Sequence, residues 1–300
     1  MNATARAAGA LRAMPGVFVL IWSTGFIVAR YGMPYAPPFK FLFVRFVLSF
    51  VCFALWAWAA RVALPRGRAQ WGHLAVTGVL MNAAYLGGVW AAVHAGMGAG
   101  LIALMVGVQP VLTAIWLATQ GGAVSRRQWA GLALGFTGLV LVVLRKVGQG
   151  GEVSLLTMGL ALAALLAITV GTLYQKRFVA PCDVRSASMV QQGAALLVTL
   201  PLAVLETQSI EWNAYSAGAM AWSVLVLTLG GSSLFYILIQ RGTATAVTSL
   251  LYLVPPCTAV MAWLLFDEPI TVLTLAGIVL TAIGVSLVVR DGRPAMPLRA

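Results

Sequence analysis

Uncharged polar side chains lie deep inside long apolar segments of this chain. Groups of this kind are costly in an apolar medium, so they commonly face a cavity or bond to a neighbouring helix. In a cavity, their amides and hydroxyls would bind a small polar solute. In the other explanation, Asn82 and Gln109 only link neighbouring helices. The mid-segment polar residues are Ser23, Thr24, Asn82, Gln109 and Thr228.

Aromatic residues and prolines accompany these polar groups. Tyr85 shares a helical face with Asn82, and Trp22 is too central for an interfacial anchor, so it packs in the core or lines a cavity. Pro110 and Pro256 each remove a backbone donor in mid-span, which predicts either paired kinks beside a cavity or a simple effect on helix shape. The candidate substrate-binding residues are Trp22, Ser23, Asn82, Tyr85, Gln109, Thr228, Tyr236 and Tyr252.

Arg45 is the one charged residue well inside an apolar run, roughly 9 Å from its start at 1.5 Å per residue. Its guanidinium either attracts an anionic group of a substrate or extends to the outer interface. Proton-coupled carriers and carriers of cations commonly hold a carboxylate within the membrane. We therefore expect a neutral or zwitterionic substrate that moves down its own gradient. All acidic residues fall in loops or at span ends: Glu152, Asp183, Glu206, Glu211, Asp267, Glu268 and Asp291.

The sequence contains no motif of an intramembrane enzyme, a metal centre or an ion channel. It has neither H-E-x-x-H nor G-x-S-x-G, and no aspartate within a span. Its three cysteines are widely spaced, which excludes a C-x-x-C metal site or a disulfide framework. A T-V-G-Y-G filter loop is also missing. We expect no enzymatic activity, no cofactor and no metal.

The composition is that of a polytopic membrane protein. Of 300 residues, 61% are hydrophobic and 9% are charged, and the mean hydropathy is +0.95. Soluble domains carry about 25% charged residues. The net charge of +12 would suggest nucleic acid in a soluble chain, but here the cations cluster between apolar runs and favour the anionic lipid of the cytoplasmic face. We expect a small-molecule substrate and membrane lipid as partners, no nucleic acid, and function as a monomer.

Ten apolar runs are long enough to cross a bilayer, which takes about 20 residues. Pro, Gly or charged residues separate them, and the first run lacks a signal-peptide cleavage site, so it is read as a retained membrane helix. The predicted fold is an all-α membrane protein with ten transmembrane helices. Their approximate ranges are 14–30, 39–60, 71–93, 99–120, 128–144, 154–175, 186–205, 217–239, 244–266 and 271–289.

Loop charges predict the orientation of these spans. With a cytoplasmic N-terminus, 14 of the 19 Lys and Arg residues fall inside and four outside, while Arg45 lies within a span. Positively charged loops favour the cytoplasm. The sequence therefore predicts a multi-pass protein of the bacterial inner (plasma) membrane with both termini cytoplasmic.

The two halves of the sequence align at a constant offset of 146 residues. Pro110 then falls on Pro256, Gly138 on Gly284, and Asn82 on Thr228. Each half holds five predicted spans, so the second half must cross the membrane in the opposite sense. We predict two inverted five-helix repeats, residues 1–146 and 147–300. Inverted repeats are typical of secondary transporters, whose substrate site lies where the halves meet.

The chain resembles the drug/metabolite transporter superfamily, in its ten-helix form with two EamA domains. The resemblance rests on Trp22 to Phe26, Arg45-Phe46, Pro256, Asp267 to Pro269, and Gly277 with Gly284. It covers nearly the whole chain. It implies alternating-access transport of metabolites, commonly the export of amino acids, with exporters of aromatic amino acids as the nearest kind. The alternatives are a proton-coupled exporter of drugs or other metabolites, and a channel.

The pattern is incomplete in two places. Gly121-Gly122 occupies the first-half position of Asp267-Glu268, and Gln191 occupies the second-half position of Arg45. These differences leave the subfamily open. The sequence predicts a carrier, and it does not name the molecule carried.

Overall fold

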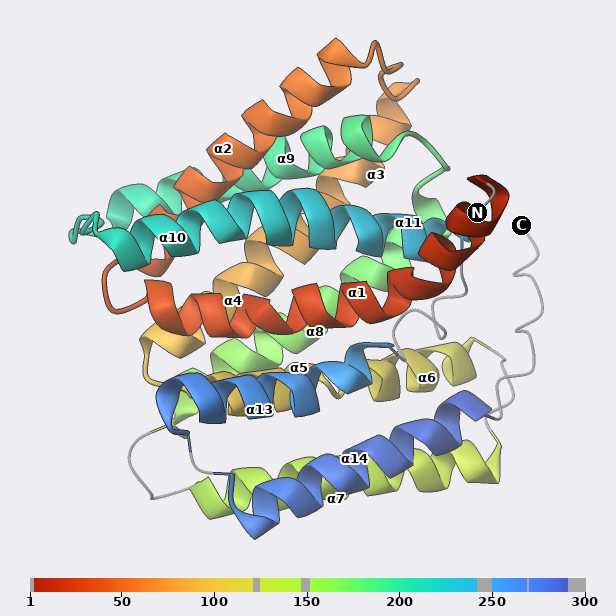
Figure 1. The fold of residues 1–300 in the computed structure, drawn as a ribbon, viewed down its shortest axis with the longest axis vertical. Coiled ribbons are helices and arrows are strands. Elements are labelled where there is room, and N and C mark those ends of the chain that lie inside the picture. Colours follow the sequence, from red (N-terminus) through yellow and green to blue (C-terminus); the bar gives the residue numbers. More distant parts are fainter. Residues whose placement is uncertain (1–2, 121–124, 147–151, 242–249, 269, 291–300) are drawn as a thin grey trace.

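The computed structural model describes residues 3–120, 125–146, 152–241, 250–268 and 270–290 (Figure 1). This part of the chain is helical throughout and contains no strand. In chain order the helices are α1 Ala3–Gly32, α2 Pro38–Ala59, α3 Arg68–Gly78, η1 Val79–Ala84, α4 Tyr85–His94, α5 Ala99–Val106, α6 Gln109–Thr119, α7 Arg126–Lys146, α8 Leu155–Phe178, α9 Val184–Leu205, α10 Ala214–Trp222, η2 Ser223–Ser232, α11 Ser233–Arg241, η3 Leu251–Leu253, α13 Val254–Phe266 and α14 Val272–Arg290.

The predicted apolar runs agree with these helices where the structure describes them. The run at 39–60 is α2, the run at 71–93 is α3 to α4, and the run at 186–205 is α9. Within the described residues, seven helices are long and apolar enough to cross a membrane by length and composition. The prediction of an all-helical membrane protein is therefore confirmed at this level.

Two of the long helices change their winding at the centre. The segments η1 and η2 are π-helical, in which the backbone bonds span five residues instead of four. Thr228 and Ser232 donate their hydroxyls to the carbonyls of Ser223 and Leu227, five residues earlier in each case. Such insertions are common at functional sites, and η1 and η2 hold the candidate residues Asn82 and Thr228.

The helices form a bundle whose two edges are helix pairs (Figure 1). At one edge α2 packs along α9, and at the other α7 packs along α14. The α7–α14 contact is close because a Cβ on Gly284 would meet the backbone of Gly131 and lie 2.8 Å from the Gly135 nitrogen. Helices α1, α4, α8, α10, α5 and α13 lie between these pairs.

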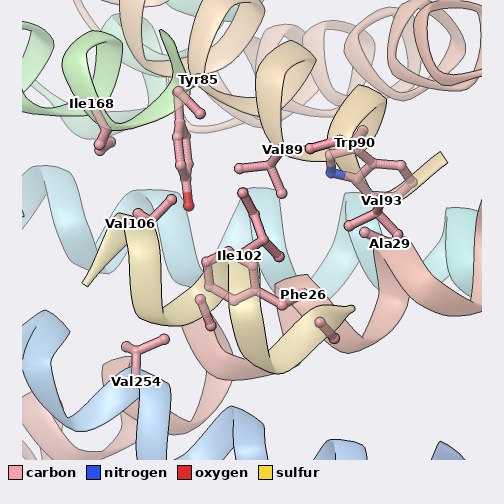
Figure 2. Packing of buried hydrophobic residues seen from close by; sticks show 14 of the residues in the cluster. Phe26, Ala29, Tyr85, Val89, Trp90, Val93, Ile102, Val106, Ile168 and Val254 are labelled. Atoms are coloured by element: carbon pink, nitrogen blue, oxygen red, sulfur yellow. The ribbon is translucent and has the colours of Figure 1, made fainter. Parts of the chain in front are cut away.

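The interior between the edges is a continuous apolar core (Figure 2). Phe26 of α1, Val89 of α4, Ile102 of α5 and Val254 of α13 are all buried there. Other large apolar residues lie on the outside, with Leu155 94% and Trp58 79% exposed. An outer surface this apolar suits lipid and not water. Because apolar residues lie both inside and outside the bundle, the buried polar residues are its unusual feature.

Acidic residues in the loops cap helices from the other half of the chain. The Glu206 carboxylate accepts from the backbone N–H groups of Phe39 (3.0 Å) and Lys40 (2.7 Å) at the start of α2. Glu268 accepts from Ala99 (3.0 Å) and Gly100 (3.3 Å) at the start of α5. A carboxylate at a helix N-terminus satisfies free donors and the helix dipole. The Asp267-Glu268 pair thus contributes to the scaffold.

Candidate functional site

A cavity lies in the bundle where helices from both halves of the chain meet. The space open to the centres of water molecules is about 50 Å³, enough for several waters at about 10–15 Å³ each. Helices α1, α2, η1, α4, α8, α9, η2 and α11 contribute to its wall. The lining residues are Trp22, Gly25, Phe26, Arg45, Met81, Asn82, Tyr85, Leu86, Val89, Trp90, Gln175, Gln191, Leu227, Ser232, Phe235 and Tyr236.

One part of the wall is a set of aromatic rings. Trp22 stacks on Tyr85 with centroids 6.2 Å apart and an interplanar angle of 8°. Phe235 lies against the same indole at 4.9 Å, tilted by 43°. In Figure 2 the Tyr85 ring extends from its helix beside Ile168 of α8. These flat faces suit an aromatic or apolar group.

The polar part of the wall centres on Arg45. Its Nε and Nη2 donate to the Thr228 hydroxyl at 3.2 and 3.1 Å, and its guanidinium carbon lies 5.8 Å from the centre of the Trp90 ring. Gln191 Nε2 donates to Gln175 Oε1 at 3.4 Å. None of the lining residues is acidic.

Four predicted site residues line the cavity together: Trp22, Asn82, Tyr85 and Tyr236. Tyr236 also contacts the segment before α9, because its hydroxyl lies 3.1 Å from Cys182 Sγ. Asn82 is 7% exposed. The structure therefore brings together residues that are up to 214 positions apart in the chain.

Three other predicted residues bond to helices instead of lining the cavity. Ser23 donates to the Val19 carbonyl at 2.7 Å. Gln109 donates to Thr172 Oγ1 at 3.1 Å and to the Ile168 carbonyl at 3.3 Å, which joins α6 to α8. Thr228 lies behind Arg45 and accepts its two bonds. These are the contacts of residues that position helices or other side chains.

The predicted prolines lie near breaks in their helices and outside the cavity wall. The chain turns at Gly107 and Val108, and Pro110 then occupies the first turn of α6. Pro256 occupies the first turn of α13, directly after the 3-10 turn η3. Proline is tolerated in a first helical turn, where the N–H has no helical acceptor. The side chain of Tyr252 lies outside the described residues.

The sequence reasoning missed several lining residues, and most of them are related to one another by the offset of 146. Every one of the following pairs is separated by that offset and has both members in the wall: Arg45 and Gln191, Met81 and Leu227, Leu86 and Ser232, Val89 and Phe235, Trp90 and Tyr236. Apolar residues such as Met81 gave no signal of their own. An aromatic residue at the related position was the available signal for some of them, as Phe235 is for Val89, whereas Met81 pairs with Leu227.

Among the described residues, no group of three or more His, Cys, Asp or Glu side chains is placed to hold a metal ion. The arrangement instead offers a guanidinium, amides, hydroxyls and aromatic faces around a small space. Groups of these kinds can bind a small organic molecule through hydrogen bonds, charge and ring contacts.

The model of the EamA-like transporter family matches residues 16–144 and again residues 155–290. The chain belongs to this family. It is a transporter with multiple membrane passes and not an enzyme.

Individual relatives agree with the family. An uncharacterized transporter of Bacillus subtilis, YvbV, is 27% identical over 90% of this chain and 88% of the relative. A probable amino-acid metabolite efflux pump of Escherichia coli is 26% identical over 89% of this chain and 90% of the relative. One solved crystal structure superposes with a TM-score of 0.68 over 92% of this chain and 95% of that one, at 18% identity. This last likeness shows the fold.

Proposed function

We propose that this transporter exports small neutral or zwitterionic metabolites, above all amino acids with an aromatic or apolar side chain, by alternating access. The observation that carries the proposal is the cavity, which joins a stacked aromatic wall to buried amides and a guanidinium. The carboxylate of an amino-acid zwitterion accepts hydrogen bonds from such donors, and its ammonium group suits hydrogen-bond acceptors and ring faces. Its apolar side chain suits the aromatic wall. The similarity to an amino-acid metabolite efflux pump supports the same class.

We infer that the membrane domain comprises ten spans in two inverted repeats, residues 1–146 and 147–300. Its support is the correspondence of helices at the offset of 146: α2 at 38–59 maps onto α9 at 184–205, and η1 lies within the mapped range of η2. The two ranges matched by the family model have the same division. The paired lining residues support the repeat, because a cavity on the axis that relates two repeats would be lined by pairs of this kind.

Unequal packing of the related helices supports alternating access. Helix α3 packs along α9, whereas its counterpart α10 has at most minor contact with α2 in this part of the chain. In an inverted-repeat carrier, an exchange of these two arrangements between the halves would turn the site toward the other side of the membrane.

We place the protein in the bacterial inner membrane as a monomer with both termini in the cytoplasm. The charge bias of the loops supports this orientation. In Figure 1 the first turns of α1 and the last turn of α14 lie on the same side of the bundle. The single connection from α2 to α3, which contains Arg61 and Arg66 and ends at Arg68, would then face the cytoplasm.

Flux into proteoliposomes that contain the purified chain tests the proposal. Labelled phenylalanine should enter saturably in the presence of the protein and not in empty liposomes, and planar bilayers should show no conductance. A pH gradient alone should not drive accumulation, because the described helical interior offers no carboxylate for a proton. Uphill accumulation under a pH gradient would establish proton coupling and reject the gradient-driven mechanism.

A further inference from the structure

We propose that Arg45 is the binding site for a carboxylate of the substrate, so that the transported molecule carries a carboxylate next to an apolar body. The inference rests on the proposed transport function, and it names the group that the cavity must recognise. It also selects between the two explanations of Arg45, because a guanidinium that lines the cavity does not extend to the interface.

The first observation is a charge without a counterion. Arg45 is 3% exposed, and its only hydrogen bonds among the described residues are to the neutral Thr228 hydroxyl. No lining residue is acidic. Removing an unpaired charge from water is strongly unfavourable, and an opposite charge in the same low-dielectric space offsets that cost. A substrate anion would supply it.

The second observation is an excess of donors on the same wall. Arg45 Nη1 and Gln175 Nε2 are both buried and have no partner among the described residues. Gln175 is 1% exposed. Buried donors without acceptors are rare in folded proteins. A carboxylate has two oxygens and only accepts hydrogen bonds, so it suits both donors.

The guanidinium is already fixed for such a contact. Two of its nitrogens are held by Thr228 and its face lies over Trp90, which leaves Nη1 for a ligand. Fixing the donor before binding reduces the entropy lost on binding. Trp22, Tyr85 and Phe235 provide ring faces in the same cavity, and these would contact the apolar body.

The related position in the second half argues against a purely structural role. Gln191 stands at the offset of 146 from Arg45, lies in the related helix α9, and also lines the cavity. A neutral side chain therefore occupies the related position in the cavity wall, so the position does not by itself require a charge. The positive charge is specific to the first half and calls for a function of its own.

Binding of three probes to the purified full chain, measured by isothermal titration calorimetry, tests the inference. L-phenylalanine and 3-phenylpropanoate both carry the carboxylate, and L-phenylalaninamide has the same body without it. We expect the amide to bind at least about 10-fold more weakly than both acids, since a charge-assisted bond in a buried site is lost. Inorganic phosphate should not compete with 3-phenylpropanoate at equal concentration. Equal binding of the amide, effective competition by phosphate, or no binding of either acid would overturn the inference.

Variants locate the effect at Arg45. Arg45→Gln should weaken binding of both acids by about 10- to 100-fold and should not weaken binding of the cationic amide, with Arg45→Lys in between. If Arg45→Gln does not fold, as judged by thermal melting, Gln175→Leu takes its place with an expected loss of about 5-fold. Gln192→Leu is the matched control, since this buried neighbour does not line the cavity. An unchanged affinity for the acids in a folded Arg45→Gln or Gln175→Leu variant would refute the assignment.

Flux measurements separate this inference from the proposed function. Phenylalanine transport that is equal in the wild type and Arg45→Gln would reject the carboxylate site and leave amino-acid transport in place. Arg45-dependent flux of 3-phenylpropanoate with no flux of phenylalanine would reject amino-acid transport and support the carboxylate site.

Discussion

Helices α2 and α9 have the same length of 22 residues and pack on each other. Each occupies the same place in its half of the chain, at an offset of 146. The two helices differ in three respects. Helix α9 crosses α3 at a glycine, while the position of that glycine in the second half is Val224. Helix α2 brings a charge to the cavity and α9 an amide. The helix starts are also capped differently. Equivalent scaffolds therefore carry unequal packing and unequal chemistry.

The largest effect is expected at the α3–α9 crossing. A Cβ on Gly78 would lie 2.6 Å from Gln191 Cα, and backbone atoms cannot move aside easily. Gly78→Val, which introduces the residue of the second half, should lower stability by about 3 kcal/mol through overpacking. Gly72→Val on the same helix is the control, because nothing lies within 4 Å of a Cβ there. Thermal melting in detergent measures both. Equal melting temperatures would mean that the close crossing does not matter.

Exchanging the cavity residues of α2 and α9 tests whether the two positions are equivalent. Gln191→Arg alone would place a second cation in a cavity without acids, so we expect a loss of about 2 kcal/mol. The double variant Arg45→Gln/Gln191→Arg should recover at least about 1 kcal/mol of this stability, because the cavity again holds a single cation. Asn82, which is related to Thr228 by the offset of 146, would be the corresponding partner of the new arginine. A double-mutant cycle of melting measurements gives the coupling. Strict additivity would show that the two side chains do not share a cavity.

Loss of an amide side chain should have different effects in the cavity wall and at a contact between helices. Gln109→Ala removes the link from α6 to Thr172 and Ile168 of α8, and should lower stability by about 1–2 kcal/mol. Asn82→Ala should reduce phenylalanine flux and change stability less, because Asn82 lines the cavity. Melting and flux are measured on both variants. A stable Gln109→Ala variant without transport would move Gln109 into the substrate site.

The smallest effects concern the helix starts. Asp183 caps α9 by accepting from Arg185 N at 2.9 Å, while α2 has Pro37 at that position and depends on Glu206. Glu206→Gln should destabilise by about 1 kcal/mol. Asp183→Asn should cost less, since asparagine also caps helices and a partly exposed ion pair contributes little. The reverse order in melting temperature would contradict this assignment of the caps.

The Asp183 effect should depend on pH. Hydrogen bonding from the Arg185 side chain lowers the pKa of the Asp183 carboxyl below its usual value. A group whose pKa is lower in the folded state stabilises the protein above the unfolded pKa of about 3.9 and loses that contribution as the pH falls through the folded value. The melting difference between Asp183→Asn and the wild type should therefore shrink in acid. A difference that grows below pH 4 would reject this.

Much of the fold followed from the sequence because the bilayer restricts what a chain can do. Runs of about 20 apolar residues must be helices in lipid, and turn residues end them, so the ranges of α2, α5–α6 and α9 were predicted to within a few positions. The sequence also predicted that Trp22, Asn82 and Tyr85 line a cavity, because polar and aromatic residues in the middle of a span are conspicuous. The π-helical winding of η1 and η2 was missed, since it leaves the apolar pattern almost unchanged.

The sequence by itself determined the class of protein and the long apolar helices, and it showed the offset of 146 residues on which the proposed repeat rests. The tertiary structure decided which polar groups share the cavity. Gln109 and Asn82 are alike in sequence context, but one bonds to α8 and the other lines the space. Helix rotation and crossing geometry set that difference, and a periodicity of 3.6 residues gives a face without saying what it meets. Only the packed helices show that Arg45 faces a cavity without an acidic partner.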